Sequence, residues 1–309
     1  MTEIENSSGY KVNVLMSTYN GEKYLKEQID SILKQKNVTV KLYIRDDGSK
    51  DSTLNILDRY KEQYPDNIII FSGDNIGFAN SFMYLVHKCE HNDFYAFADQ
   101  DDIWEQNKLE VAIKMIDQKV PLLYASNLQV FDTVENRNYL MYSLESFKNE
   151  KARMEKYCYL CNPYGCTMVW NEALQEEILK REKPDKQTHD IWINLIAHYT
   201  GKMILDPNSY IHYRVHGNNA CGATPKSIIN KIRKYLKFYF IDNKSLNISL
   251  SCQSIERYFK NKSNKYIYYF ANYKKSIGLK VMALINIKKL KINKNSISKY
   301  RLLILFNKF

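Results

Sequence analysis

The most constraining feature of this sequence is an alternation of short apolar runs with amphipathic stretches between Lys11 and Asp99. The runs have the length of strands, and the stretches repeat apolar residues at helical spacing. Strands are expected at 12–17, 40–46, 67–71 and 94–99, and helices at 22–35, 51–64 and 77–87. Such alternation is typical of βαβ units, so we expect an α/β fold with a mostly parallel sheet flanked by helices.

Polar, small and acidic residues follow each of the four expected strands. These segments read STYN at 17–20, RDDGS at 45–49, GDNIG at 73–77 and ADQDD at 98–102. In an open parallel sheet, ligands bind at the carboxyl ends of the strands. The sequence therefore predicts a binding site at this edge of the sheet.

The stretch FADQDDIW, at 97–104, places three carboxylates directly after an apolar run. On an extended strand end, residues two apart point to the same side. Asp99 and Asp101 are then expected to project together, with Gln100 facing away and Asp102 opposite to Asp101. Paired carboxylates suit Mg²⁺ or Mn²⁺, and such an ion can hold a diphosphate. A solvated acidic loop is the alternative.

Several other site types lack their sequence signals. The first turn reads TYNGE, without the glycine fingerprint of a dinucleotide-binding fold, and no GxxxxGK[ST] phosphate loop occurs. A zinc site at Cys158, Cys161 and Cys166 lacks a clear fourth ligand. No nucleophile elbow supports a serine triad.

The cysteines, the N-terminal residues and the apolar runs indicate the cellular compartment. Six irregularly spaced cysteines fit a reducing cytoplasm better than a disulfide scaffold. The start MTEIENSSGY does not resemble a secretory signal, and no run approaches the roughly 18 apolar residues of a membrane span. We therefore expect a cytoplasmic protein.

Charge divides the chain into two parts near residues 222–225. Residues 226–309 hold 20 Lys and Arg against two acids, whereas the remaining 25 basic and 32 acidic residues leave residues 1–225 at −7. Apolar residues recur at helical spacing among lysines in 228–240 and 276–291. Such helices can lie on an anionic membrane surface. A helical cap packed on residues 1–225 and an oligomer contact are the alternatives; no nucleic-acid-binding motif accompanies the charge.

The strand-end motifs resemble those of a known family. STYN, RDDGSKDST, NIG and FADQDDIW are similar, in this order, to the motifs of the large inverting glycosyltransferase family 2, which has the GT-A fold. HDIW at 189–192 and YRVHGNN at 213–219 are most similar to its rhamnosyltransferase-like branch. The resemblance covers roughly residues 11–220. It implies a catalytic domain at 1–225, with nucleotide-sugar binding at about 11–120 and an acceptor side at about 121–225.

The resemblance also implies a nucleotide-sugar site. Thr18, Tyr19 and Asp47 would hold the base, where a carboxylate can accept the imide N–H of uracil or thymine. Asp46 could instead cap its turn, and Arg214 would contact the departing phosphates. The full set is Thr18, Tyr19, Asn20, Glu22, Asp46, Asp47, Asn75, Gly77, Asp99, Gln100 and Arg214.

Metal, acceptor and base positions follow from the same resemblance. Asp101 would be the main ligand of Mn²⁺ or Mg²⁺, helped by Asp99 and His216, with His212 competing for the last role. Asp190, in the first turn of a helix that Thr188 can cap, would be the general base. Residues expected at the acceptor are Asp102, Trp104, Gly165, Cys166, His189 and Trp192.

These observations predict a metal-dependent, inverting glycosyltransferase. The resemblance implies transfer of L-rhamnose from dTDP-L-rhamnose to a hydroxyl of a lipid-linked glycan, in bacterial surface polysaccharide synthesis such as capsule or O-antigen, at the inner face of the membrane. Alternatives are a transferase for another UDP- or dTDP-hexose, a nucleotidyltransferase, and a non-catalytic glycan- or membrane-binding protein of the same fold. Nucleic acid is not an expected partner.

Overall fold

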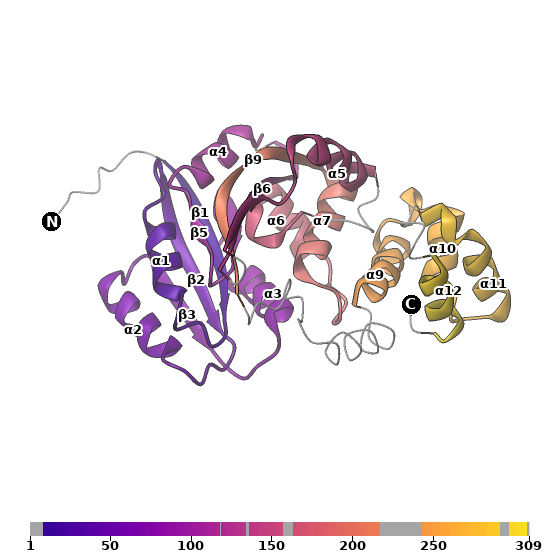
Figure 1. Cartoon of the computed structure of the whole chain (residues 1–309), viewed down its shortest axis with the longest axis horizontal. Coiled ribbons are helices and arrows are strands. Elements are labelled where there is room, and N and C mark those ends of the chain that lie inside the picture. Colours follow the sequence, from indigo (N-terminus) through magenta and orange to yellow (C-terminus); the bar gives the residue numbers. More distant parts are fainter. Residues whose placement is uncertain are drawn as a thin grey trace.

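A computed structural model describes residues 9–117, 119–133, 136–156, 163–216, 243–290, 297–307 and 309. One curled sheet lies at the centre of its first two thirds, and the C-terminal helices form the opposite end of the molecule (Figure 1). The strand order is β3-β2-β1-β4-β8-β6-β9-β5, with β7 paired to β6.

The strands are β1 (Tyr10–Thr18), β2 (Val38–Asp46), β3 (Ile68–Ser72), β4 (Phe94–Ala98), β5 (Ile103–Trp104), β6 (Leu122–Asp132), β7 (Arg137–Leu140), β8 (Met168–Asn171) and β9 (Lys202–Val215). The helices are α1 (Leu25–Leu33), α2 (Thr53–Gln63), α3 (Phe78–Lys88), α4 (Lys108–Met115), α5 (Leu144–Lys156), α6 (Glu172–Leu179), α7 (His189–Thr200), α9 (Asn243–Tyr258), α10 (Lys265–Asn272), α11 (Ile277–Asn286) and α12 (Ile297–Leu305).

The predicted βαβ alternation is confirmed. Strand β1 runs parallel to β2 and β4, and β2 runs parallel to β3. Thr18 pairs with Asp46, and Asp46 pairs with Ser72, so the carboxyl ends of these strands meet at one edge. Strands β5, β7 and β8 pair antiparallel, which makes the sheet mixed but mostly parallel at its N-terminal half.

Both faces of the sheet are buried, and strand β4 shows why its sequence is continuously apolar. Its residues Phe94, Ala96 and Ala98 face the core beneath α1, α2 and α4. The alternate residues Tyr95 and Phe97 face a second core shared with α3, α6 and α7. The strand therefore has no solvent-facing side.

The chain turns immediately after β4, which corrects the expected extended strand through residue 99. Strand β4 ends at Ala98, a turn occupies Gln100 and Asp101, and β5 follows. The sheet curls so that β5, its last strand, lies beside α1, where the Trp104 backbone N–H donates to Ser31 Oγ at 3.0 Å. The chain must change direction to reach that edge, so the period-2 rule does not apply to residues 99–102.

The described part of the basic C-terminal segment is helical, as predicted. Helix α9 packs on α7, and its Ile248, Cys252 and Ile255 belong to the same core as α3 and α7. The expected helix at 228–240 and the boundary at 222–225 lie outside the described residues. Among the helices that are described, none combines the length and apolar character needed to cross a bilayer.

Candidate active site

A cavity of about 650 Å³ lies at the carboxyl edge of β1, β2 and β4. It brings together most of the residues that the sequence singled out. Those that line it are Tyr19, Asn20, Asp47, Asn75, Gly77, Asp99, Gln100, Asp101, Gly165, Cys166, His189, Asp190 and His216. They come from both the proposed nucleotide half and the proposed acceptor half of residues 1–225.

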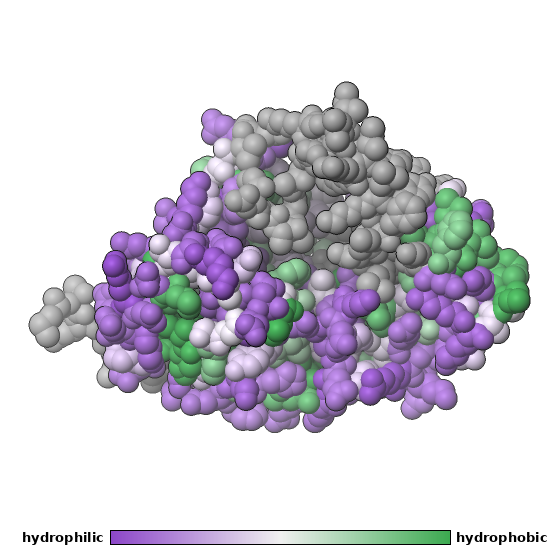
Figure 2. Space-filling model, turned by 90° about the horizontal axis from the view of Figure 1, so that it is seen from below, coloured by the Kyte–Doolittle hydropathy of each residue, from purple (hydrophilic) through white to green (hydrophobic). Residues whose placement is uncertain are grey.

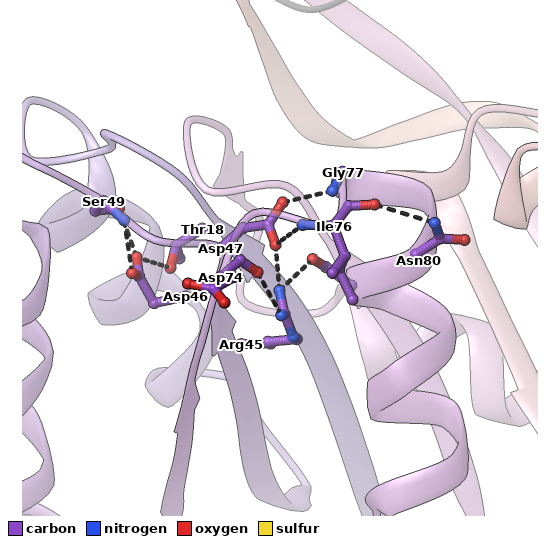
Figure 3. Close-up of polar contacts among 10 residues, drawn as sticks. Thr18, Arg45, Asp46, Asp47, Ser49, Asp74, Ile76, Gly77 and Asn80 are labelled. Carbon is purple, nitrogen blue, oxygen red and sulfur yellow. Dashed lines mark hydrogen bonds and ion pairs between the residues drawn. The ribbon is translucent and has the colours of Figure 1, made fainter.

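Asp47 organises one wall of this cavity (Figure 3). Its carboxylate forms a buried ion pair with Arg45 and accepts the backbone N–H groups of Ile76 and Gly77, each at 2.8 Å. Arg45 also donates to the backbone carbonyl of Asp74 at 2.9 Å. The loop after β3 is thereby fixed to the end of β2, with Gly77 at a φ of 82° that glycine adopts readily.

Asp46, by contrast, points toward Thr18 and Ser49 and holds a loop (Figure 3), and it is not among the residues that line the cavity. Its carboxylate accepts Thr18 Oγ1 at 3.0 Å and the Ser49 backbone N–H at 2.9 Å. Asp46 and Thr18 are fully buried and do not line the cavity, and the Ser49 contact is the one that the turn-capping alternative predicts for Asp46. Glu22 likewise accepts the Ser52 backbone N–H at 2.8 Å and does not line the cavity.

Gln100 does not face away from the site, contrary to expectation. Its side chain accepts the backbone N–H of Tyr19 at 2.9 Å and donates to the carbonyl of the same residue at 3.1 Å. The turn after β4 rotates Gln100 toward the loop after β1. Gln100 therefore lines the cavity while it fixes Tyr19, whose ring remains 47% exposed.

The acidic groups after β4 lie close together. Ligand atoms of Asp99, Asp102 and Cys166 all lie within 4.8 Å of one another. Burial, followed by the charges of Asp101 and Asp190, raises the pKa of Asp99 to about 7. Carboxylates gathered in this way disfavour their own ionisation, and a divalent cation would relieve that repulsion.

Asp102, which was expected at the acceptor, does not line the cavity. It is fully buried, and its Oδ1 accepts the backbone N–H of Arg214 at 3.1 Å. Its Oδ2 finds no hydrogen-bond partner in the part of the chain that the structure describes. Burial is the largest cause of the raised pKa of Asp102, followed by the charges of Asp99 and Asp101.

His216 joins this acidic group from the end of β9. Its Nε2 lies 2.8 Å from Oδ2 of Asp101, and both residues line the cavity. The competing histidine, His212, pairs instead with Glu105 at 2.6 Å and is not a lining residue. Carboxylates with one imidazole form a donor set that suits Mn²⁺, so Asp99, Asp101 and His216 fit the predicted metal site by residue type and by the contact of Asp101 with His216. The ligand atoms that lie within 4.8 Å of one another, however, belong to Asp99, Asp102 and Cys166.

Arg214, which was expected at the departing phosphates, supports the acidic turn and does not line the cavity. Its Nε donates to the carbonyl of Asp101 at 3.0 Å, and its Nη2 forms an ion pair with Glu27 at 2.5 Å. The guanidinium also lies 4.4 Å from the ring centre of Tyr24. These contacts fix the backbone of Asp101 through a residue that does not line the cavity.

Asp190 and His189 line the cavity from the first turn of α7. Asp190 lies in the first turn of α7, as expected, and lines the cavity. Thr188 stands before that helix, but its side chain makes no capping hydrogen bond. His189 stacks on Phe82 at 4.1 Å, and burial lowers its pKa to about 4, so the ring is neutral at pH 7. A Cβ at Gly165 would lie 3.0 Å from His189 Nε2.

Trp104 and Trp192 are core residues. Their exposed fractions are 3% and 0%, and neither lines the cavity. The ring of Trp104 lies 3.6 Å from Nζ of Lys108, and Trp192 packs against Tyr258 of α9. Both tryptophans therefore lie away from the cavity at which they were expected to contact the acceptor.

Several lining residues were not expected from the sequence. Tyr24 falls within the helix expected at 22–35, yet it lies at the cavity in the turn before α1. Tyr164 directly precedes Gly165, and Tyr213 opens the YRVHGNN motif, so both could have been identified from their neighbours in the sequence. Phe78 and Phe82 of α3 gave no signal beyond helical spacing.

Comparisons with known proteins show the family of the chain. The family model described as Glycosyl transferase family 2 matches residues 13–178. The dTDP-rhamnosyl transferase RfbG of Shigella flexneri is 30% identical over 240 residues, which cover 74% of this chain and 80% of that protein. An uncharacterized glycosyltransferase of Haemophilus influenzae is 26% identical and covers 82% of each chain.

Solved structures confirm the predicted GT-A fold. S. aureus TarS 1–349 in complex with UDP-GlcNAc superposes with a TM-score of 0.54 at 17% identity, covering 96% of this chain and 91% of that one. The mannosyltransferase PcManGT from Pyrobaculum calidifontis, in complex with GDP-Man and Mn²⁺, gives a TM-score of 0.55 at 14% identity, covering 98% and 89%.

Proposed function

The chain belongs to glycosyl transferase family 2, and from this premise we propose that it is an inverting, metal-dependent rhamnosyltransferase that uses dTDP-L-rhamnose. The 30% identity to a protein named dTDP-rhamnosyl transferase supports the donor. Another UDP- or dTDP-hexose is the alternative, since the described contacts do not distinguish one hexose from another.

The observation that carries the proposal is the joint presence of Asp190 and the strand-end acids Asp99 and Asp101 in one cavity. In an inverting transfer, a carboxylate removes the proton of the acceptor hydroxyl while that oxygen attacks the anomeric carbon. The bond to the nucleoside diphosphate breaks on the opposite side. Asp190, in the first turn of α7 at this cavity, would be the base.

The metal would be held by Asp101, Asp99 and His216. A bound Mn²⁺ or Mg²⁺ supplies positive charge to the departing diphosphate. Within the protein, Arg214 supports this arrangement by bonding the Asp101 carbonyl, and Tyr24 stacks beside His216 with ring centres 4.9 Å apart. These contacts keep the ligands in place before the ion binds.

The nucleotide would bind at the wall formed by Tyr19, Asn20, Asp47, Asn75 and Gly77. The exposed ring of Tyr19 offers a face for stacking a base. The Asp47 carboxylate already accepts two backbone N–H groups, so an imide N–H of the base would share it. Gln100 fixes the backbone of Tyr19 and thereby the position of the ring.

The acceptor would enter along Gly165, Cys166 and His189, next to Asp190. Burial raises the pKa of the Cys166 thiol, and His189 is neutral, so this wall carries little charge. An uncharged wall suits the hydroxyl-rich surface of a sugar. We propose a lipid-linked glycan as acceptor, in bacterial surface polysaccharide synthesis at the inner membrane face, with the basic C-terminal segment as membrane attachment or oligomer contact.

A panel of nucleotide sugars tests the proposal. The protein is incubated with dTDP-L-rhamnose and with UDP- and dTDP-hexoses, with Mn²⁺ or EDTA, and released nucleoside diphosphate is measured. We expect slow Mn²⁺-dependent hydrolysis of dTDP-L-rhamnose. Full turnover in EDTA contradicts the metal, pyrophosphate release indicates a nucleotidyltransferase, and glycan binding without turnover of any donor indicates a binding protein.

A further inference from the structure

Helix α11 carries a row of exposed apolar side chains. Ile277, Val281 and Ile285 follow one another at four-residue spacing, on one face of the helix. Their exposed fractions are 84%, 44% and 65%, although a helix in a globular protein usually buries such a row. The opposite side of α11 is packed, since Ala283 is fully buried.

The end of α12 extends this apolar surface. Leu305 is 50% exposed and Phe306, which follows the helix, is 72% exposed. Nζ of Lys280 in α11 donates to the carbonyl of Leu305 at 3.3 Å, so the two helices meet there. Figure 2 shows hydrophobic surface at the end of the molecule that carries these helices. We call Ile277, Val281, Ile285, Leu305 and Phe306 the C-terminal apolar face.

The charged residues near this face in the sequence are all basic, because no Asp or Glu occurs after Glu256. Lys274 and Lys275 precede α11 with Ser276 between, and Lys288 and Lys289 follow it after Ile287. All four lysines are exposed. The apolar row is therefore bracketed at both ends by cations without an acidic residue near it in the chain.

We propose that the C-terminal apolar face docks on an anionic lipid bilayer, with its isoleucines and Phe306 in the interface and the bracketing lysines at lipid phosphates. Exposed apolar patches mark interaction surfaces, and the combination with lysines matches the chemistry of an anionic membrane. The proposal rests on the proposed function, whose lipid-linked acceptor lies in such a membrane, and it assigns the attachment to particular residues.

The same charges argue against a second copy of this chain as the occupant. A symmetric contact would bring the two lysine-bracketed faces together, with like charges facing each other. Helix α9 is excluded from the docking surface for a different reason. Its apolar side is already covered by α7, and residues such as Ile248 and Cys252 are buried there.

Vesicle cosedimentation of the full-length protein tests the docking face. Vesicles of phosphatidylcholine with 30% phosphatidylglycerol, a chosen composition of roughly bacterial charge density, are compared with phosphatidylcholine alone. Ile277→Glu with Ile285→Glu should weaken binding to anionic vesicles by roughly tenfold or more, because two inserted side chains are lost. Lys274→Gln with Lys275→Gln should weaken it by about fivefold per lysine and reduce its salt dependence.

Matched changes elsewhere serve as controls. Leu144→Glu alters an apolar residue of 63% exposure on α5, and Lys26→Gln with Lys34→Gln removes two exposed lysines, one in α1 and one at its C-cap. Both should bind vesicles as the unchanged protein does. Donor hydrolysis, which needs no membrane, should persist in every variant, so a failed docking face and a failed glycosyltransferase assignment give different results.

Two outcomes overturn the proposal. One is vesicle binding that the double isoleucine variant retains in full. The other is an absence of vesicle binding by the unchanged protein, together with a dimer that Ile277→Glu with Ile285→Glu converts to monomer in sedimentation. The second result would assign the face to a contact between copies of the chain.

Discussion

The Nε2 atom of His216 lies 2.8 Å from Oδ2 of Asp101, which joins the end of β9 to the turn after β4. The two residues are far apart in the chain, yet both line the same cavity. An imidazole and a carboxylate already in contact need only small movements to share a cation.

This contact predicts unequal effects for two histidines of one strand region. His216→Ala should weaken Mn²⁺-dependent binding of dTDP by roughly tenfold to a hundredfold, because one ligand is lost. His212→Ala should leave it unchanged, since His212 pairs with Glu105 away from the cavity. Calorimetric titration of dTDP with Mn²⁺ and with EDTA measures both. Equal losses in the two variants would contradict the assignment.

Replacing the proposed base should separate binding from chemistry. In Asp190→Asn, the amide keeps the shape of the side chain but cannot take a proton, so we expect turnover to fall roughly 10²- to 10⁴-fold. Donor affinity should change little, because the metal and nucleotide residues stay in place. Initial rates and equilibrium titration with the same donor provide the measurement. A variant with normal turnover would remove Asp190 from the mechanism.

The buried imidazole of His189 predicts a pH dependence of stability. Its pKa is about 4 in the folded chain and 6.5 in the reference state, so only the unfolded chain binds its proton between these values. Stability therefore falls as pH drops from about 6.5 to 4, by up to about 3 kcal/mol for this group. Asp99, with its raised pKa, acts in the opposite sense over part of this range.

The His189 contribution is isolated by difference. Urea midpoints of the unchanged protein and of His189→Gln are compared from pH 4 to 7, because the Asp99 contribution is common to both. The stability difference should shift in favour of the glutamine variant as pH falls. A difference that does not vary with pH would show that His189 is not held neutral by burial.

Gly165 predicts a steric effect on the acceptor wall. A Cβ there would lie 3.0 Å from His189 Nε2 and 3.4 Å from Asp190 Cβ. Gly165→Ala should therefore displace the base and lower turnover by roughly tenfold to a hundredfold. Gly278→Ala, whose nearest neighbour atom would be 4.0 Å away, should leave donor hydrolysis unchanged. Similar activity in both variants would indicate that His189 and Asp190 accommodate the added methyl group without loss of turnover.

Two serines of α9 test how much that helix stabilises the segment before α7. Ser251 Oγ accepts Nε2 of Gln187 at 2.8 Å, with both residues fully buried. Ser251→Ala leaves the glutamine unpaired and should lower the free energy of unfolding by about 1–3 kcal/mol. Ser249 Oγ is buried without a hydrogen-bond partner among the described residues, so Ser249→Ala should be neutral or stabilising. Urea denaturation compares the two.

The sheet and its binding edge were predictable because each depends on local sequence pattern. Apolar runs and helical spacing define the βαβ units, and parallel strands bring their carboxyl ends together whatever their side chains. Asp99 and Asp101 could therefore be placed at this edge before the fold was known. The motif resemblance added Asp190 and His216, which periodicity alone would not have identified.

The errors arose where distant segments decide the environment of a side chain. The turn at Gln100 depends on β5 reaching α1, so its direction was not contained in residues 97–104. Trp192 is buried by Tyr258, from a helix more than sixty positions later in the chain. Tyr24 reaches the cavity because the helix begins at Leu25 rather than residue 22. Such contacts are tertiary, and a local pattern does not encode them.

The pairing of β9 with β6 also limits how this enzyme can change over evolution. Strand β9 pairs in parallel with β6 from Lys202 to Val215, and His216 follows directly. Inserting or deleting one residue in β9 would turn His216 to the other side of the sheet, because side chains alternate along a strand. Single-residue insertions or deletions there should abolish turnover. The irregular pairing near Asn127 is the part of the strand pair where such a change would disturb the register least. New acceptor preferences can therefore arise more easily by substitution than by insertion along this strand.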